Sequence, residues 1–331
     1  MSTAVVVGAG AWGTALADLV ARNGHTTRLW AREPDVVADV NANHANTRFL
    51  KGATLAPALT ATEDLADAVR DASTITFVAP SHVLRAVVRS VAHAVPHDAT
   101  LIVATKGIER ESFALMTDIV GEELPGRPVV ALSGPSFAAE VAMRQPTAVV
   151  AASRDAAAAV QTQQLFASPE FRVYTQRDVI GVELGGALKN VMAVATGVLD
   201  GLGLGFNPRA ALITRGLAEM TRLGLALGAE PLTFAGLAGI GDLVLTCTGS
   251  LSRNRTVGVE IGQGRPIEEV LHARETIAEG VITTQSAHAL AVARGVDMPI
   301  VRSMHRILFE AMPPRDAIAE LMARALRAES D

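Results

Sequence analysis

Lys189 is the residue in this sequence whose surroundings point most directly to chemistry. It lies in the stretch 181–194, whose pattern predicts a helix, and its neighbours on the same helical face are small or apolar. A cation on such a face is costly unless it is paired or used. Gly185 and Gly186 on that face destabilise a helix by about 1 kcal/mol each relative to alanine, so we expect something to approach the backbone closely. Taken alone, the stretch fits equally well a long lysine that reaches solvent from a packed helix.

The second candidate for chemistry is a glycine pattern near the N-terminus. Gly8, Gly10 and Gly13 form a GxGxxG directly after an apolar strand pattern and directly before an amphipathic helix pattern. In that context the first glycine permits a tight turn, the second lets a pyrophosphate approach the backbone, and the third lets helix and strand pack closely. The pattern therefore predicts a dinucleotide-binding turn, and an ordinary glycine-rich turn is the alternative.

The corner that follows the second predicted strand decides between NAD and NADP. NAD sites usually place an acidic residue there for the ribose 2′-hydroxyl, whereas this chain has Arg32 followed by Glu33. An arginine at that corner can pair with the 2′-phosphate of NADP. We therefore expect NADP(H) to be favoured, and Glu33 keeps NAD(H) open. A solvated surface charge is the alternative for Arg32.

Three further polar stretches are unusual for residues that only pack. Lys106 follows the end of a predicted strand, where ligands of open α/β sheets bind, and Ser136 lies in a second turn from strand to helix, at 133–138. A glycine-containing segment at 239–255 suits a phosphate or carboxylate, because a guanidinium offers paired donors. That segment carries Asp242, Thr246, Ser252, Arg253, Asn254 and Arg255. Each stretch alone is also typical of a surface loop.

Composition and charge exclude several classes of protein. The 331 residues are 49% apolar and 19% charged, which indicates a compact globular protein of two domains. The net charge of −5 and scattered basic residues argue against nucleic acid as a partner. No signal peptide is predicted, and the weakly polar run 191–205 contains Asp200 and glycines, so no membrane span is predicted. The single Cys247 fits a buried packing residue in a reducing, cytoplasmic compartment.

Other catalytic chemistries lack their motifs. The only histidine pair at i, i+4 spacing, His93 and His97, has Pro96 between its members, so no metal site is predicted. Neither a nucleophile elbow nor a P-loop is present in the sequence. Hydride transfer with a lysine acid/base is the most coherent chemistry for these residues.

The elements that position these residues fall into two classes along the chain. Up to about residue 177, short apolar strand patterns alternate with helix patterns, which predicts a Rossmann-like, doubly wound parallel sheet. From about 178 to 331 helix patterns dominate. We therefore predict a dinucleotide-binding α/β domain at 1–177 and an all-helical substrate-binding and catalytic domain at 178–331.

Several motifs together resemble the bacterial NAD(P)-dependent sn-glycerol-3-phosphate dehydrogenase family. They are GAGAWGTALA, ATKGIE, SGPSFAAE, GVELGGALKNV, NPRAALITRGLAEM, GDLVLTCTGSLSRNR and AEGV, and the resemblance covers nearly the whole chain. It implies interconversion of glycerol 3-phosphate and dihydroxyacetone phosphate, as a cytoplasmic supply of glycerol 3-phosphate for phospholipid synthesis. The oligomeric state stays open, although helical second domains of this kind often pair, which makes a homodimer one candidate.

The resemblance also implies roles for individual residues. Lys189 matches the proton acceptor, and Lys106 matches a residue that contacts both substrate and nicotinamide. The implied substrate contacts are Lys106, Gly134, Ser136, Lys189, Asn190, Asp242, Thr246, Ser252, Arg253 and Asn254. With the glycine turn and its corner included, the expected cofactor contacts are Gly8, Gly10, Ala11, Trp12, Gly13, Arg32, Lys106, Ala138, Arg253, Ile277 and Glu279.

Two departures and two rival functions accompany this resemblance. The family often has serine at the position of Ala11 and an aromatic residue at the position of Val281, and both changes concern cofactor affinity. A β-hydroxyacid dehydrogenase combines the same two kinds of domain with a lysine, and its substrate carboxylate would also suit an arginine loop. A dinucleotide-sensing protein without turnover is the rival from another class, but it leaves Lys189 and the segment 252–255 without a role.

Overall fold

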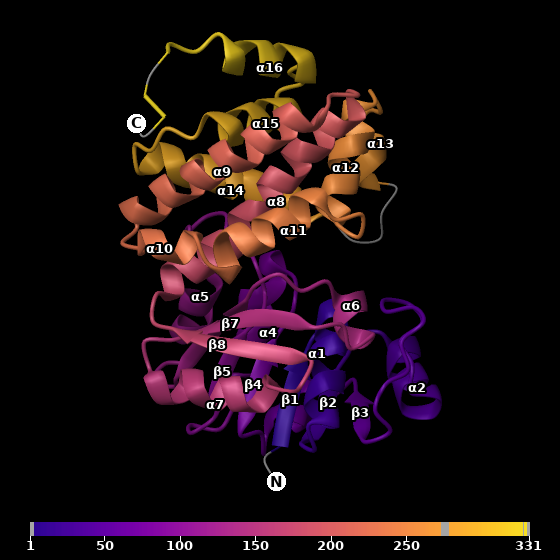
Figure 1. The fold of residues 1–331 in the computed structure, drawn as a ribbon. Helices are drawn as coiled ribbons and strands as arrows, with labels where there is room; N and C mark the ends of the chain where they lie inside the picture. Colours follow the sequence, from indigo (N-terminus) through magenta and orange to yellow (C-terminus); the bar gives the residue numbers. More distant parts are fainter. Residues whose placement is uncertain (1–2, 273–277, 327, 330–331) are drawn as a thin grey trace. The chain divides into compact units, whose positions relative to one another are not determined.

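The computed structural model describes residues 3–272, 278–326 and 328–329, and it divides into two compact units (Figure 1). The first unit comprises Met1–Gly186 and Ala229–Asp242, and the second comprises Ala187–Gly228 and Leu243–Asp331. The predicted boundary at 177/178 differs from this division, which falls inside helix α8 (Val179–Gly201). The difference arises because the start of α8 and the segment up to Asp242 pack with the sheet, which helix patterns alone do not reveal.

The first unit is built on an eight-stranded sheet with the order β3-β2-β1-β4-β5-β6-β7-β8. The strands are β1 (Thr3–Val7), β2 (Thr26–Trp30), β3 (Leu59–Thr62), β4 (Thr74–Phe77), β5 (Thr100–Val103), β6 (Val129–Ser133), β7 (Thr147–Ala152) and β8 (Phe171–Gln176). Neighbours run parallel except β6 and β7, which run antiparallel. The predicted Rossmann-like sheet is confirmed, with this one antiparallel pair as an addition to the prediction.

The strand order places a reversal at β1 and β4, and helices cover the sheet. Chain connections leave β1 toward β2 on one side and return to β4 on the other, which is the switch point where open α/β sheets bind ligands. Central strands β4 and β5 are buried at every residue, as expected for continuous apolar runs between helical layers. The helices of this unit that precede α8 are α1 (Ala11–Arg22), α2 (Pro34–Asn43), α3 (Leu65–Val69), α4 (Leu84–Val91), α5 (Met116–Glu123), α6 (Ala138–Ala142) and α7 (Ala156–Phe166), with a short turn of helix at Ser81–Val83.

The second unit is helical throughout its described residues, as predicted. Beyond the later part of α8 it contains α9 (Phe206–Ala226), α11 (Asp242–Thr248), α12 (Arg253–Gly262), α13 (Ile267–His272), α14 (Glu279–Ala293), α15 (Pro299–Phe309) and α16 (Pro314–Met322). The two short elements α10 (Pro231–Phe234) and Leu237–Gly241 lie in the segment that belongs to the first unit.

Two helical stretches are long and apolar enough to cross a membrane by length and composition alone. They are Val179–Gly201 and Pro231–Thr248, and 89% and 44% of their most apolar windows are buried within the protein. The first is therefore a core helix, since buried core helices have the same composition as membrane spans. The second is weak evidence for a span.

Within the second unit, α8 and α12 approach each other through glycines. Gly197 and Gly201 on α8 face Gly258 and Gly262 on α12, with the same four-residue spacing on both helices. A Cβ on Gly258 would overlap the carbonyl oxygen of Val194 and lie 2.9 Å from the Cα of Gly197. The two backbones are therefore nearer than side chains would allow, and this contact positions the first turn of α12 against α8.

We predict that Gly258→Ala destabilises the protein, because the added methyl group meets backbone atoms that cannot move independently. The expected loss is about 1–3 kcal/mol of unfolding free energy, measured by denaturant titration. Gly121→Ala in α5 is the matched control, because a Cβ there meets nothing within 4 Å and alanine is the better helix former. Equal stability of the two variants would contradict the close packing of α8 and α12.

Candidate active site

The glycine turn after β1 has the geometry that its sequence predicts. Gly8 has φ +116°, a left-handed conformation, and its Cβ position lies 3.1 Å from backbone atoms of Val78 and Ala79 after β4. A Cβ on Gly13 would overlap the carbonyl oxygen of Gly8, whereas a Cβ on Gly10 would meet nothing within 4 Å. The three glycines thus serve the turn, the open approach and the close packing expected of them.

The N-terminus of α1 fits the phosphates of a dinucleotide. Its N-cap is Gly10, which offers no side-chain oxygen, and its first turn contains no acidic residue. The backbone N–H groups of that turn are therefore suited to an external anion. The buried indole nitrogen of Trp12 has no hydrogen-bond partner among the described residues, so a further donor remains at this turn. Ala11 is the first residue of α1 and contributes only its backbone.

The corner after β2 carries an exposed arginine beside an acidic residue. The side chain of Arg32 is 83% exposed, and its Nε and Nη2 donate to Glu33 Oε1 at 3.2 and 3.0 Å. An exposed pair between chain neighbours is weak, so Arg32 can exchange this partner for a phosphate at little cost.

In the first unit, an ion pair joins Lys106 and Asp242. Lys106 follows β5, and its Nζ lies 2.6 Å from Oδ2 of Asp242, whose side chain is only 1% exposed. The same ammonium lies 3.4 Å from the carbonyl oxygen of Gly134, which also accepts the Ser136 hydroxyl at 3.0 Å. The structure therefore brings four of the predicted substrate contacts together at the carboxyl ends of β5 and β6. Ala138 begins α6, directly after this turn.

Lys189 is buried in the second unit and bonds to another predicted residue. Lys189 is 7% exposed, and its Nζ donates to Thr246 Oγ1 of α11 at 2.9 Å. The alternative of a lysine that reaches solvent is therefore wrong. A buried ammonium keeps a large desolvation cost unless it has polar partners or a chemical task.

A short chain of amides extends this group of residues within the second unit. Asn254 Nδ2 donates to Asn190 Oδ1 at 2.9 Å, and Asn254 Oδ1 accepts from the backbone N–H of Gly280 at 2.9 Å. Gly280 must lack a side chain, because a Cβ there would lie 2.5 Å from the carbonyl oxygen of Asn190. The first turn of α14, which includes Glu279, is thereby held against α8 and α12.

The remaining predicted residues at 252–255 have distinct local roles. Ser252 is the N-cap of α12, and its hydroxyl oxygen accepts the N–H of Arg255 at 3.2 Å. Arg253 is the first residue of that helix. Arg255 instead binds Asp200 of α8, with Nη2 2.7 Å from Oδ2, so it serves the α8–α12 contact. Ile277 lies outside the described residues.

Sequence reasoning missed the glycines that allow these contacts. The paired four-residue spacings at 197/201 and 258/262 were a readable signal of close helix packing. Gly280 is not part of such a spacing, so its role was not predictable from the sequence.

Comparison with known proteins shows what this chain is similar to. The model of the NAD-dependent glycerol-3-phosphate dehydrogenase N-terminus matches residues 3–159, and that of the C-terminus of the same enzyme matches residues 178–319. These two matches run across the glycine turn, Lys106, Lys189 and the segment 252–254.

Curated and solved relatives cover nearly the same length. A protein of Geobacter metallireducens named glycerol-3-phosphate dehydrogenase (NAD(P)+) is 54% identical over 98% of both chains, and one of Geobacter sp. strain M21 with the same name is 53% identical over 98% of both. The crystal structure of a glycerol-3-phosphate dehydrogenase from Coxiella burnetii is 41% identical, with a TM-score of 0.94, covering 98% of this chain and 99% of that one.

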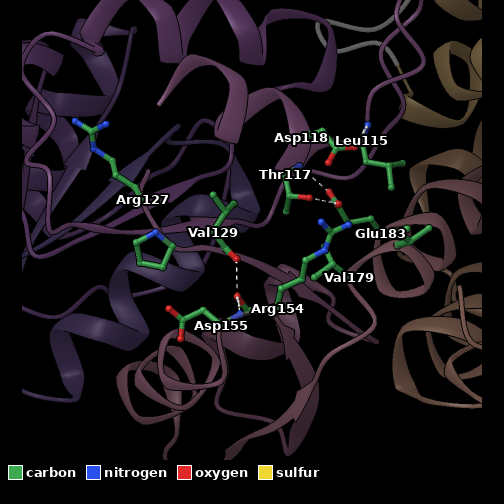
Figure 2. Close-up of a pocket in the computed structure, with 12 residues that line it drawn as sticks. Leu115, Thr117, Asp118, Arg127, Val129, Arg154, Asp155, Val179 and Glu183 are labelled. Atoms are coloured by element: carbon green, nitrogen blue, oxygen red, sulfur yellow. Dashed lines mark hydrogen bonds between the residues drawn. The ribbon is translucent and has the colours of Figure 1, made fainter. Parts of the chain in front are cut away.

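A hollow in the first unit lies apart from all these residues. It has a volume of about 280 Å³ and is lined by residues of α5, β6, the turn after β7 and the start of α8 (Figure 2). None of the predicted site residues lines it. Arg127 in its wall donates to the carbonyl oxygens of Pro96 and Val95, both at 2.8 Å. Since no predicted site residue lines it, this hollow is not the candidate site.

One buried carboxyl in the wall of that hollow is electrostatically unusual. Figure 2 shows Glu183 facing Thr117, whose N–H donates to Glu183 Oε1 at 2.9 Å and whose hydroxyl donates to Oε2. Burial raises the pKa of Glu183 to about 7, although the bonds from Thr117 act in the opposite direction. The folded protein therefore holds a proton that the unfolded chain releases at lower pH.

We predict that Glu183→Gln changes the pH dependence of stability. With a folded pKa of about 7 against an ordinary glutamate value of 4.5, the stabilisation from this group is fully present below pH 4.5 and is lost as pH rises through about 7. The neutral variant lacks this decline, so its unfolding free energy relative to wild type should rise by about 3 kcal/mol from pH 4.5 to 8. Urea titrations check this, with exposed Glu63→Gln as the control. A difference that does not vary with pH would contradict the burial effect.

Proposed function

The chain belongs to the NAD-dependent glycerol-3-phosphate dehydrogenase family, and from this premise we propose that it interconverts sn-glycerol 3-phosphate and dihydroxyacetone phosphate. It is an oxidoreductase that moves a hydride to or from C2 of the three-carbon phosphate. The observation that carries this function is the buried Lys189, bonded to Thr246, in a chain whose other unit has a dinucleotide turn at its switch point. Nicotinamide supplies the hydride in reduction and receives it in oxidation.

Lys189 provides the proton in this scheme. During reduction its ammonium donates a proton to the C2 oxygen as the carbonyl becomes an alcohol, and during oxidation the neutral amine takes the hydroxyl proton. The bond of Lys189 Nζ to Thr246 Oγ1 orients the amine, because a lysine side chain otherwise has many rotamers. The long apolar stem lies in a buried part of α8, which excludes water from the proton transfer.

The segment 252–254 holds the phosphate of the substrate. Arg253 supplies a guanidinium fork for phosphate oxygens, and Ser252 and Asn254 supply neutral donors beside it. Asn254 is fixed by its bonds to Asn190 and Gly280, so its position is set before substrate binds. Phosphate binding is remote from C2, and its energy is used to align the reacting carbon.

Lys106 binds an oxygen atom of the substrate through its ammonium group. Its ion pair with the buried Asp242 fixes the ammonium at the carboxyl end of β5, next to the Gly134–Ser136 turn. In this proposal Asp242 positions the Lys106 ammonium and also contacts the substrate directly.

The cofactor is NAD or NADP, and we propose a preference for NADP(H). This rests on Arg32, which is exposed at the corner after β2 and forms an ion pair with the neighbouring Glu33. A 2′-phosphate gives that guanidinium a stronger partner than an exposed carboxylate. Glu33 keeps NAD(H) usable, because its carboxylate can accept a ribose hydroxyl.

The cellular setting and assembly are proposals of the same kind. A cytoplasmic enzyme that supplies glycerol 3-phosphate for phospholipid synthesis fits the single, fully buried Cys247, which needs no oxidising compartment. Pairing into a homodimer also stays a prediction.

The rival β-hydroxyacid dehydrogenase is disfavoured by the family match along the whole chain. Oxidation of NADPH on adding dihydroxyacetone phosphate, but not a 3-oxo acid, separates the two.

We predict that Lys189→Met abolishes turnover, with kcat falling by about 10²-fold or more because proton transfer loses its donor. The measurement is NADPH oxidation with dihydroxyacetone phosphate, and the wild type is the reference. NADPH affinity, measured by fluorescence titration, should change by less than about threefold because the glycine turn is untouched. A variant with near wild-type kcat would remove Lys189 from the mechanism.

We predict that Arg32→Glu shifts cofactor preference from NADPH toward NADH. The ratio of kcat/KM for the two cofactors should fall by about tenfold or more, since one charge-assisted phosphate contact is replaced by repulsion. Arg48→Glu, on a partly exposed arginine outside the predicted cofactor contacts, is the control for a general change of surface charge. An unchanged ratio in the Arg32 variant would contradict the proposed role of this corner.

A further inference from the structure

The two adjacent glycines at the start of α8 face two different segments of the first unit. A Cβ on Gly185 would overlap the carbonyl oxygen of Ala238, in the segment that leads to Asp242. A Cβ on Gly186 would lie 2.6 Å from the hydroxyl oxygen of Ser133, at the end of β6, and 3.5 Å from Cγ and Cδ of Lys106. Gly185 and Gly186 therefore contact both of the chain segments that carry the Lys106–Asp242 ion pair.

Lys106 is held at its charged end and along its stem. Its ammonium has Asp242 Oδ2 at 2.6 Å and the Gly134 carbonyl oxygen at 3.4 Å. Its Cγ and Cδ lie 3.5 Å from the position that a Cβ on Gly186 would take, which is an ordinary van der Waals distance. A lysine side chain has several rotatable bonds, so a wall beside the stem limits the positions its ammonium can take.

Ser133 also lies against Gly186, although no hydrogen bond among the described residues explains a polar side chain there. Ser133 is 6% exposed, and its hydroxyl has no hydrogen-bond partner among the described residues. A buried hydroxyl without a partner is destabilising, so its presence is not explained by stability. Its oxygen is the atom nearest to the missing Cβ of Gly186, and it fills the space that this Cβ would take.

We propose that Gly186 is a positioning residue: the notch it leaves on α8 is where Ser133 and the stem of Lys106 pack, and this notch sets where the Lys106 ammonium meets the substrate. The inference rests on the proposed function, because Lys106 matters only if it contacts the phosphorylated triose. Gly185 has the parallel task for the backbone that precedes Asp242. The destabilisation of the helix by two successive glycines is then explained by the placement of one ion pair.

The test is a double-mutant cycle with Gly186→Ala and Ser133→Ala. The methyl group added at Gly186 must displace Ser133 Oγ, which shares the notch with the Lys106 stem, so G186A should lower kcat/KM for dihydroxyacetone phosphate by about tenfold or more. The affinity for NADPH alone should stay within about twofold, because the glycine turn does not touch the notch. In S133A/G186A the obstructing oxygen is gone, and the loss caused by G186A should shrink by at least about threefold.

Gly185→Ala is the matched control for this rescue. Its added methyl group meets backbone of Ala238 rather than a side chain, so Ser133→Ala should not restore activity to G185A. A role of Gly186 in general stability alone would lower NADPH affinity and kcat/KM together and would show the same response to S133A at both glycines.

Each outcome of the cycle decides the proposal. Wild-type kcat/KM in G186A, or a loss that S133A does not reduce, overturns the positioning role while leaving the proposed function intact. If G186A does not fold, S133A/G186A decides alone: a folded and active double variant supports the notch, and a folded, inactive one overturns it. A wild type that does not reduce dihydroxyacetone phosphate overturns the proposed function and this inference with it.

Discussion

The structure depends on the close approach of other backbone segments to helix α8. In the first unit, Gly185 lies against the backbone before Asp242, and in the second unit Gly197 and Gly201 lie against the backbone of α12. Each glycine weakens the helix by about 1 kcal/mol, and in return it brings a neighbouring segment nearer than any side chain permits. Lys189 lies between these two groups of glycines along the helix. Placement of polar side chains, rather than helix stability, therefore accounts for the composition of α8.

Features that depend on one residue type at a fixed spacing were predictable from the sequence. The glycine turn is such a feature, because Gly8, Gly10 and Gly13 each answer a different backbone requirement and the structure meets all of them. Buried central strands are another, since the short runs of β4 and β5 lack charged residues and are buried on both faces. The all-helical character of the second unit followed from the loss of strand patterns after residue 178.

The sequence did not predict which polar residues form hydrogen bonds or ion pairs across long sequence distances. Lys106 and Asp242 are 136 residues apart, and Asn190 and Asn254 are 64 apart, so no local spacing links them. The polar residues of 252–255 were grouped as one loop, but Arg255 binds Asp200 while Ser252 caps α12. The antiparallel placement of β7 and the division of the chain inside α8 likewise depend on packing, because neither changes the hydrophobic pattern of the segment concerned.

The hydrogen-bond valences at 252–254 explain why this segment suits an anion. Ser252 uses its hydroxyl oxygen to accept the N–H of Arg255, and Asn254 uses its carbonyl oxygen to accept the N–H of Gly280. One amide hydrogen of Asn254 is donated to Asn190. The second amide hydrogen of Asn254 and the Ser252 hydroxyl hydrogen take no part in these three bonds among the described residues. We propose that these two donors serve the phosphate of the substrate, whose oxygens are acceptors.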